Sequence, residues 1–477
     1  MNIKSFGRDF IVYGVSSSIS KFVGIFLVPI YTRIFSPEDY GTMDLVSTTV
    51  SLVTLLGILQ LESAVSRYYF EEKDEVSRNN MISSALWTCL CLSIVVYILL
   101  AFCSNYISTL LFDVNSYAYL LVIAGIGIPI ANLNSIFTVV MRFKKKPYHY
   151  LFFQLSQITV TISLTVALVV YYRIGIVGVY IGQVTGYSII ALCQAVYLRS
   201  HLMVTWHKSV VKKMLRYSIP LVPAVAGTWA NTNFNRVVML GYLSVADIGL
   251  YVVALKLASA FQLVGAAFRM AWPPFFWETF ENNPDHKKVF ISLFNHVSLL
   301  LFSLVIILTL YSEEVVMLLT TKQYYPSANL VGLLAFAIAI NNILVQITGV
   351  GPGITKRTEY NTIIYFLSVA VNVGALFILV PIFGLIGVPI SLLLGSLTLL
   401  SVGWYNSERL YPIGFEKVRM VILVVLTLGF ISLDYWLVIP FAAKASITAI
   451  LFGYLYKKYQ YLLHSLFVMV QRNQTNF

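Results

Sequence analysis

The sequence predicts an all-α polytopic membrane protein with about fourteen transmembrane helices. Three observations lead to this class: 58% of the 477 residues are hydrophobic, only 11% are charged, and the mean hydropathy is +0.81. A soluble globular protein carries about 25% charged residues. We expect two parallel six-helix repeats around a central cleft, followed by two additional C-terminal helices.

Apolar stretches of about 20 residues, the length that crosses the hydrocarbon core of a bilayer, occur fourteen times. The first follows a polar start carrying Lys4 and Arg8, and we read it as a helix because no small-residue cleavage site precedes the next loop. The stretches lie at 10–31, 42–61, 81–103, 117–141, 150–172, 174–198, 215–235, 248–269, 289–311, 327–350, 360–380, 383–404, 418–438 and 440–456.

The loops between these stretches differ strongly in charge. If the N-terminus is cytoplasmic, 25 of the 32 lysines and arginines fall in cytoplasmic segments and five in the opposite loops. Short cytoplasmic loops retain Lys and Arg, so this division predicts that both termini are cytoplasmic. The net charge of +12 follows from the same bias and from anionic inner-leaflet lipid, and it gives no support to nucleic-acid binding.

The two halves of the chain resemble each other at an offset of 208–209 residues. Phe35–Gly41 corresponds to Leu243–Gly249, and Gly175–Val179 corresponds to Gly384–Val388. Six helices separate the copies, and an even number keeps the repeats parallel, so the substrate of such a transporter would lie between the halves. The predicted division is 1–200 and 215–408 for the two bundles, 201–214 for a cytoplasmic linker that resembles an amphipathic helix, and 409–477 for the extra helices and tail.

The repeated acidic loops could be catalytic or could cap helices. Paired carboxylates would suit a membrane glycosyltransferase, but in Ser36-Pro37-Glu38-Asp39 the serine can be an N-cap and the proline suits the first helical position. The carboxylates would then lie at the positive end of the helix dipole. We favour capping, and no catalytic or metal-binding motif is evident in the sequence. Cys89, Cys91, Cys103 and Cys193 lack metal-ligand spacing and are expected to pack as small apolar residues.

Two lysines fall inside apolar stretches, and both are candidate substrate contacts. Lys21 lies midway along 10–31 and Lys256 near the middle of 248–269. A charge there costs roughly 2.5–3.5 kcal/mol and must face a partner or a cavity. Lys21 is eleven residues from its helix end, about 16 Å at 1.5 Å per residue, so its side chain cannot reach the interface. Ser17 shares the face of Lys21, and Gln262 shares the face of Lys256.

Other polar residues add to this candidate cavity. Asn231 and Asn235 lie on one face of the seventh stretch, after two prolines that permit bending. They could line a wet cavity or form interhelical hydrogen bonds. Arg33 and Arg236 lie near the outer ends of their stretches, where snorkelling is also possible. No acidic residue lies in mid-membrane, since Asp44 and Glu62 are near the ends of their stretch.

The chain resembles the Wzx-type lipid-linked oligosaccharide flippases, in the polysaccharide transporter family of the multidrug/oligosaccharidyl-lipid/polysaccharide exporter superfamily. The resemblance rests on Pro29–Gly41, on Arg216–Pro223, and on the continuation through Asn235-Arg236, Gly249–Tyr251, Ala254–Leu257 and Trp272-Pro273. It covers essentially the whole chain. The family commonly has an acidic residue before the arginine at position 236, whereas Asn235 stands here.

This resemblance implies a substrate and a location. The substrate would be an undecaprenyl-diphosphate-linked O-antigen or capsular repeat unit, moved from the cytoplasmic to the periplasmic leaflet of the bacterial inner membrane by alternating access. Lys21 and Lys256 would hold the diphosphate or an acidic sugar. Candidate partners are membrane lipid, an O-antigen polymerase and a chain-length regulator. We expect no enzymatic activity and no cofactor, and a coupling cation, proton or sodium, is left open.

Three alternatives are weighed against this interpretation. A multidrug exporter of the same superfamily would usually have twelve spans and an acidic cavity. A lipid II flippase would use the same cationic cleft. A membrane glycosyltransferase or polymerase would need a long outer loop with catalytic carboxylates, which the sequence does not show.

Overall fold

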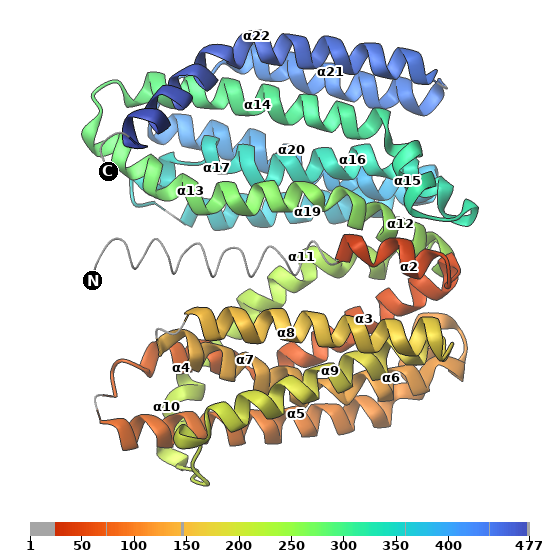
Figure 1. Cartoon of the computed structure of the whole chain (residues 1–477), viewed down its shortest axis with the longest axis vertical. Helices are drawn as coiled ribbons and strands as arrows, with labels where there is room; N and C mark the ends of the chain where they lie inside the picture. Colours follow the sequence, from red (N-terminus) through yellow and green to blue (C-terminus); the bar gives the residue numbers. More distant parts are fainter. Residues whose placement is uncertain (1–23, 73, 145–146, 358, 438, 475–477) are drawn as a thin grey trace. The chain divides into compact units, whose positions relative to one another are not determined.

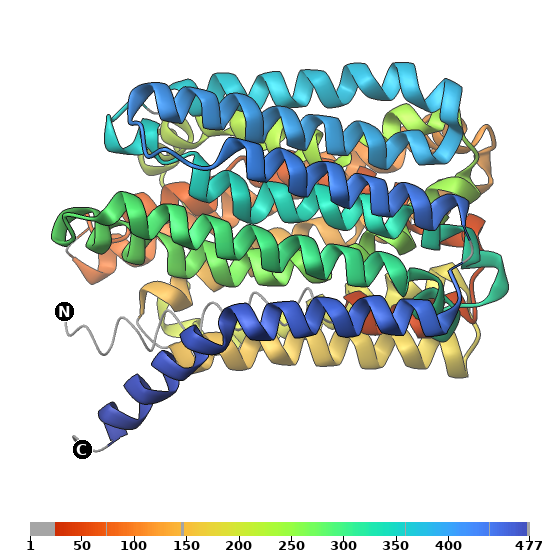
Figure 2. The same cartoon turned by 90° about the horizontal axis from the view of Figure 1, so that it is seen from above.

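The computed structural model describes residues 24–72, 74–144, 147–357, 359–437 and 439–474, and these residues are almost entirely helical, with no strand among them (Figures 1 and 2). The predicted all-α class is therefore confirmed. The chain forms two compact units. The first is Met1–Lys256 with Leu376–Val388, and the second is Leu257–Ala375 with Pro389–Phe477. The division into two six-helix bundles remains a prediction. The two compact units are defined by contacts between residues, and such contacts do not test whether the chain is a duplication.

The first unit is built mainly from the helices before Lys256, and short 3₁₀ or π segments connect several of them. These helices are α2 (Val28–Thr32), α3 (Pro37–Ile58), α4 (Leu61–Tyr68), α5 (Glu75–Phe112), α6 (Ala118–Gly125), α7 (Gly127–Phe143), α8 (Pro147–Val166), α9 (Ile176–Tyr197), α10 (Lys208–Ser218), α11 (Val222–Leu240) and α12 (Val245–Ala258).

The second unit contains most of the later helices. These are α13 (Ala260–Asn282), α14 (His286–Leu310), α15 (Ser312–Leu319), α16 (Ala328–Ala339), α17 (Val345–Thr348), α18 (Gly351–Ile354), α19 (Glu359–Phe383), α20 (Gly387–Leu410), α21 (Lys417–Trp436) and α22 (Phe441–Gln474), with parts of α19 and α20 in the first unit. A π-helical turn, η6 (Ile340–Leu344), follows α16.

Nine of the described helices are long and apolar enough to cross a membrane, or ten if α12 and α13, bent by 43° at Ser259, form one span. The segment 359–410 counts as one in this test, although it contains two helices, α19 and α20. The exact number of fourteen spans stays a prediction. The chain is a multi-pass membrane protein.

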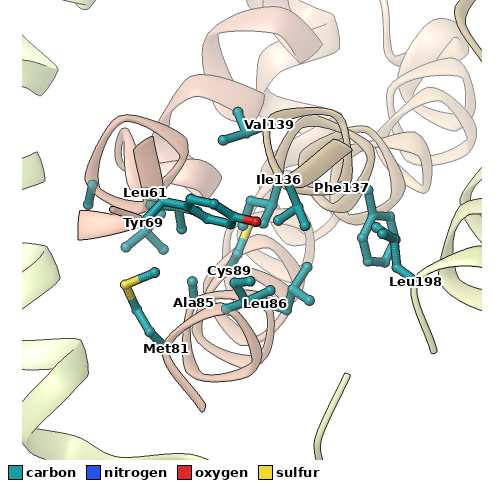
Figure 3. Close-up of a cluster of buried hydrophobic side chains, with 14 of the residues drawn as sticks. Leu61, Tyr69, Met81, Ala85, Leu86, Cys89, Ile136, Phe137, Val139 and Leu198 are labelled. Carbon is teal, nitrogen blue, oxygen red and sulfur yellow. The ribbon is translucent and has the colours of Figure 1, made fainter. Parts of the chain in front are cut away.

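A tightly packed apolar cluster holds the first unit together. It joins α4 and α5 to α7, and Figure 3 shows Leu61, Cys89 and Ile136 directed toward one another. Each of these three side chains is fully buried. Transfer of a large aliphatic side chain from water into a protein core contributes roughly 1.5–3 kcal/mol. The contribution is smaller in a membrane protein, because lipid tails are as apolar as the core. Of the four cysteines expected to pack as small apolar residues, Cys89 is buried in this cluster, whereas Cys91, Cys103 and Cys193 are exposed. Among the described residues, no group of His, Cys, Asp and Glu side chains could hold a metal ion.

The predicted amphipathic linker is only partly helical. Helix α10 begins at Lys208 and packs Val211 and Met214 into the same cluster, whereas residues 202–207 are not helical. The cause is a set of hydrogen bonds with α5: the Met203 amide donates to Ser83 Oγ at 2.8 Å, and the His207 amide donates to Ser84 Oγ at 3.1 Å. The helical expectation for this stretch was wrong because side-chain acceptors on α5 satisfy its backbone instead.

In the second unit the last two helices pack against α14, and α21 makes the larger contact (Figure 1). An ion pair attaches α22 to α15, because the buried Lys444 ammonium lies 2.9 Å from Glu314 Oε1. Asn295 of α14 donates to Glu416, next to the start of α21, at 3.0 Å. Polar contacts near both ends therefore reinforce the apolar packing of this additional pair.

The repeat is visible in the backbone. Gly175 and Gly384, which correspond at the offset of 209, have φ values of +72° and +62°. This left-handed region favours glycine, because a Cβ atom would be strained there. Gly175 precedes α9, and Gly384 begins the short turn that leads into α20. Both copies of the repeat therefore have a glycine with positive φ at the start of the corresponding helix.

Candidate functional site

The candidate site lies in the first unit, where the start of α3 meets α12. The two helices touch at their first turns: a Cβ atom on Gly249 would lie 1.9 Å from the Pro37 carbonyl oxygen, and one on Gly41 would lie 2.0 Å from the Val245 carbonyl oxygen. Pro37 and Val245 occupy equivalent positions in the repeat, as do Gly41 and Gly249. The two copies of the repeated motif therefore pack on each other reciprocally, and only glycine allows so close an approach.

Capping boxes begin both helices. Ser36 Oγ accepts from the Asp39 amide at 3.1 Å, and Asp39 Oδ2 accepts from the Ser36 amide at 3.0 Å. Ser244 and Asp247 repeat this arrangement, with corresponding distances of 3.2 and 3.1 Å. The capping interpretation of these loops is thus confirmed, and Asp39 and Asp247 are engaged at helix starts.

An ion pair joins α3 to α11 about two turns after the start of α3. Arg236 Nε lies 2.9 Å from Asp44 Oδ2, with side-chain exposures of 7% and 17%. Arg236 also donates to the Thr232 carbonyl at 2.8 Å, and its guanidinium carbon lies 5.6 Å from the Tyr251 ring centroid. The acidic partner of Arg236 therefore comes from the first half of the chain and not from position 235.

A second contact between the same helices lies seven residues away. Trp229 Nε1 donates to Ser51 Oγ at 2.8 Å. Trp229 precedes Arg236 by seven residues, and Ser51 follows Asp44 by seven, so each pair of side chains lies two turns apart on one face of its helix. The two helices consequently run antiparallel along a polar seam.

Lys256 lies beside α3 as well. Its ammonium donates to Tyr40 Oη at 2.9 Å and lies 4.8 Å from the centre of the Tyr40 ring. The Tyr40 side chain is buried, and its ring contacts that of Tyr31 at 6.3 Å. Lys256 is half-buried. The Tyr40 ring and hydroxyl therefore orient its ammonium group, which stays partly accessible.

The other predicted site residues are distributed. Asn235 is buried and Asn231 half-buried on α11, and the exposed Arg33 donates to the Pro29 carbonyl at 3.3 Å. Gln262 belongs to the second unit, beyond the bend at Ser259 that interrupts the face expected to continue from Lys256. Lys21 and Ser17 lie outside the described residues. Their roles in a cavity stay predictions.

Two polar contacts in the structure were not predicted from the sequence. The first is the ion pair of Asp44 with Arg236, because Asp44 lies near the end of its apolar stretch and no partner was predicted for it. The second is a hydrogen bond from Arg269 of α13 to Asn342 of the π-turn η6. Such π-turns within helices frequently mark functional positions.

Comparison with known proteins adds family and fold. The model of a family described as polysaccharide biosynthesis protein matches residues 30–329, more than half of the chain. The chain is similar to the Lsg locus putative protein 1 of Haemophilus influenzae, with 24% identity over 328 residues covering 66% of this chain and 77% of the relative.

Solved structures share its fold at low identity. An inward closed structure of the lipid II flippase MurJ matches with a TM-score of 0.72 and 15% identity, covering 95% of this chain and all of that one. An inward-facing multidrug resistance transporter of the MATE family matches with a TM-score of 0.61 and 14% identity, over 86% and 96% of the two chains. The predicted superfamily fold is thereby confirmed.

Proposed function

The chain belongs to the family of polysaccharide biosynthesis proteins, and we propose that it is a flippase for an undecaprenyl-diphosphate-linked oligosaccharide repeat unit, of the O-antigen or capsular kind. The observation that carries the proposal is the combination of this family with a fold that matches the MurJ flippase along 95% of the chain. The substrate would move from the cytoplasmic to the periplasmic leaflet of an inner membrane, and a polymerase and a chain-length regulator would receive it.

The described residues suggest how the charged headgroup is met. A diphosphate cannot enter hydrocarbon without compensation, and Lys256 offers an ammonium that Tyr40 orients at 2.9 Å. In the proposal Lys256 contacts the headgroup together with Lys21. Arg236 is a positioning residue, because its charge is compensated by Asp44. Transport would proceed by rocking of helical bundles, as in other transporters built from repeats.

A lipid II flippase is the second candidate, since the structural match to MurJ is the stronger of the two solved structures compared. The two functions share the lipid diphosphate and differ in the attached sugars. Complementation distinguishes them: a lipid II flippase would sustain growth of cells depleted of their own, and a repeat-unit flippase would restore surface polysaccharide instead.

The test of the proposal uses a deletion strain of the native host. We expect loss of surface polysaccharide, with accumulation of the lipid-linked repeat unit in the inner leaflet, and restoration by the intact gene. Lys256→Ala should restore export poorly at normal protein level, whereas Lys288→Ala should restore it fully, because the Lys288 side chain is 81% exposed and pairs with Asp285 at the surface. Normal export with Lys256→Ala would remove this lysine from the mechanism, and normal surface polysaccharide in the deletion strain would refute the function.

A further inference from the structure

A cavity inside the first unit is lined by uncharged polar, aromatic and small aliphatic residues. Its volume is about 260 Å³, and its walls come from α3, α6, α7 and α9. On α3 the lining residues Ser47, Ser51 and Thr54 follow a spacing of four and three residues, so they form one polar stripe on that helix.

The cavity lies deep along α3. Ser47 and Thr54 are ten and seventeen residues beyond Pro37, about 15 and 25 Å along the helix at 1.5 Å per residue. Polar groups at membrane depth are costly when they face lipid, and irregular or polar regions there usually line a cavity. This position favours a role for the stripe in transport.

Small residues on α7 create the space. Gly127 and Ala131, one turn apart, line the cavity, and a Cβ atom on Gly127 would already lie 3.4 Å from Val184 Cγ2 of α9. The opposite wall is held rigidly, because the buried Tyr180 donates to the Met43 carbonyl at 3.0 Å. The cavity is therefore a preformed feature of the bundle.

Two lining groups are available to a ligand. Among the described residues, neither the Gln183 amide nor the Tyr187 hydroxyl has a hydrogen-bond partner, and both side chains are half-buried in α9. Gln183 can donate and accept, and Tyr187 can do both through its hydroxyl while presenting an apolar ring. Charged residues are absent from the described lining.

We infer that this cavity binds one uncharged sugar ring of the transported oligosaccharide, an inference that rests on the proposed function. A neutral pyranose combines hydroxyl groups at its edge with apolar C–H faces, which matches amide, hydroxyl and tyrosine groups together. The volume is just below the ~300–1,000 Å³ typical of ligand pockets and suits a single ring. A uronic acid would bind poorly, because its carboxylate would be desolvated without a cationic partner.

The test measures binding of defined lipids to the full-length protein in nanodiscs prepared without sugar detergents, by native mass spectrometry. The probes are undecaprenyl diphosphate alone and the same lipid bearing one N-acetylglucosamine, N-acetylgalactosamine, galactose or glucuronic acid. We expect at least one neutral sugar to increase affinity about tenfold over the bare lipid, as two neutral hydrogen bonds would do, and glucuronic acid to give no increase.

Variants separate the cavity from general damage. The double change Gln183→Ala and Tyr187→Phe, and the cavity-filling change Ala131→Leu, should abolish the tenfold increase while leaving binding of the bare lipid unchanged. Ser163→Leu, at an exposed position of α8 that is not part of the lining, should preserve the increase. A sugar preference that survives both cavity variants, or no preference in the parent, would overturn the inference while leaving lipid binding intact. Failure of the parent to bind any of the lipids would count against the proposed function and would remove the basis of the inference with it.

Discussion

The Asp44–Arg236 pair should couple the stability of the two halves of the chain. Asp44 lies on α3 of the first repeat and Arg236 on α11 of the second, at 2.9 Å and with little exposure. We consider Asp44→Ala, Arg236→Ala and the double variant. Removing one partner of a buried pair typically costs about 3–5 kcal/mol, because the other charge is left buried.

The structure places the expected loss at the lower end of that range. Asp44 retains 17% exposure, and Arg236 keeps its hydrogen bond to the Thr232 carbonyl and its contact with the Tyr251 ring. We therefore expect a loss of about 3 kcal/mol for either single variant. The double variant should lose clearly less than the sum, with a coupling energy of about 1.5–3 kcal/mol, as for a hydrogen bond between charged groups.

The assay is a double-mutant cycle on the free energy of unfolding, measured by denaturant titration in detergent micelles. The matched control is the Trp229–Ser51 hydrogen bond, two turns away on the same seam and neutral, which should couple by no more than about 1 kcal/mol. Losses that add to within about 0.5 kcal/mol for Asp44 and Arg236 would show that the pair is not coupled and would refute the reasoning.

Three further predictions concern stability in the first unit. Gly249→Ala should reduce the melting temperature and the yield strongly, because its Cβ atom would meet the Pro37 carbonyl oxygen at 1.9 Å. Ser36→Ala should lower the free energy of unfolding by about 0.5–2 kcal/mol through loss of the cap, with export retained. Glu62→Gln should raise the melting temperature at alkaline pH and have little effect at acidic pH. Burial raises the pKa of the Glu62 carboxyl, so its contribution to stability is present at low pH and lost as pH rises through the raised pKa.

Each of these has a matched comparison. Gly227→Ala, at a helical glycine with open space around its Cβ position, should stabilise by up to about 1 kcal/mol, so equal damage at Gly227 and Gly249 would contradict the close-packing argument. Complete loss of export by Ser36→Ala at normal protein level would favour a catalytic role for the loop. An equal change of melting temperature by Glu62→Gln at acidic and alkaline pH would contradict the effect of burial on the Glu62 carboxyl.

Local signals allowed much of this fold to be predicted. The apolar stretches gave the all-α membrane class, and the spacing of Ser36, Pro37 and Asp39 gave the start of α3, because capping depends on residues within one turn. The repeat gave the equivalent start at Ser244.

Contacts between distant segments could not be predicted in the same way. The partner of Arg236 lies 192 residues away, and no local pattern distinguishes Asp44 from a carboxylate at a membrane surface. Likewise, residues 202–207 have an amphipathic composition, but their backbone is satisfied by serines of α5 that lie about 120 residues earlier. In both cases hydrogen bonds between distant segments determine the structure, and a local sequence pattern does not contain that information.

The reciprocal contact of Gly41 with Val245 and of Gly249 with Pro37 has an evolutionary consequence. In a half-length ancestor the same two positions would have met across the two-fold axis of a homodimer, so one substitution would have altered both sides of the interface at once. In a single chain that holds both copies, the two sides of the contact can change independently. The proline and glutamate at 37 and 38 now correspond to valine and alanine at 245 and 246, a divergence that a symmetric dimer could not have sampled.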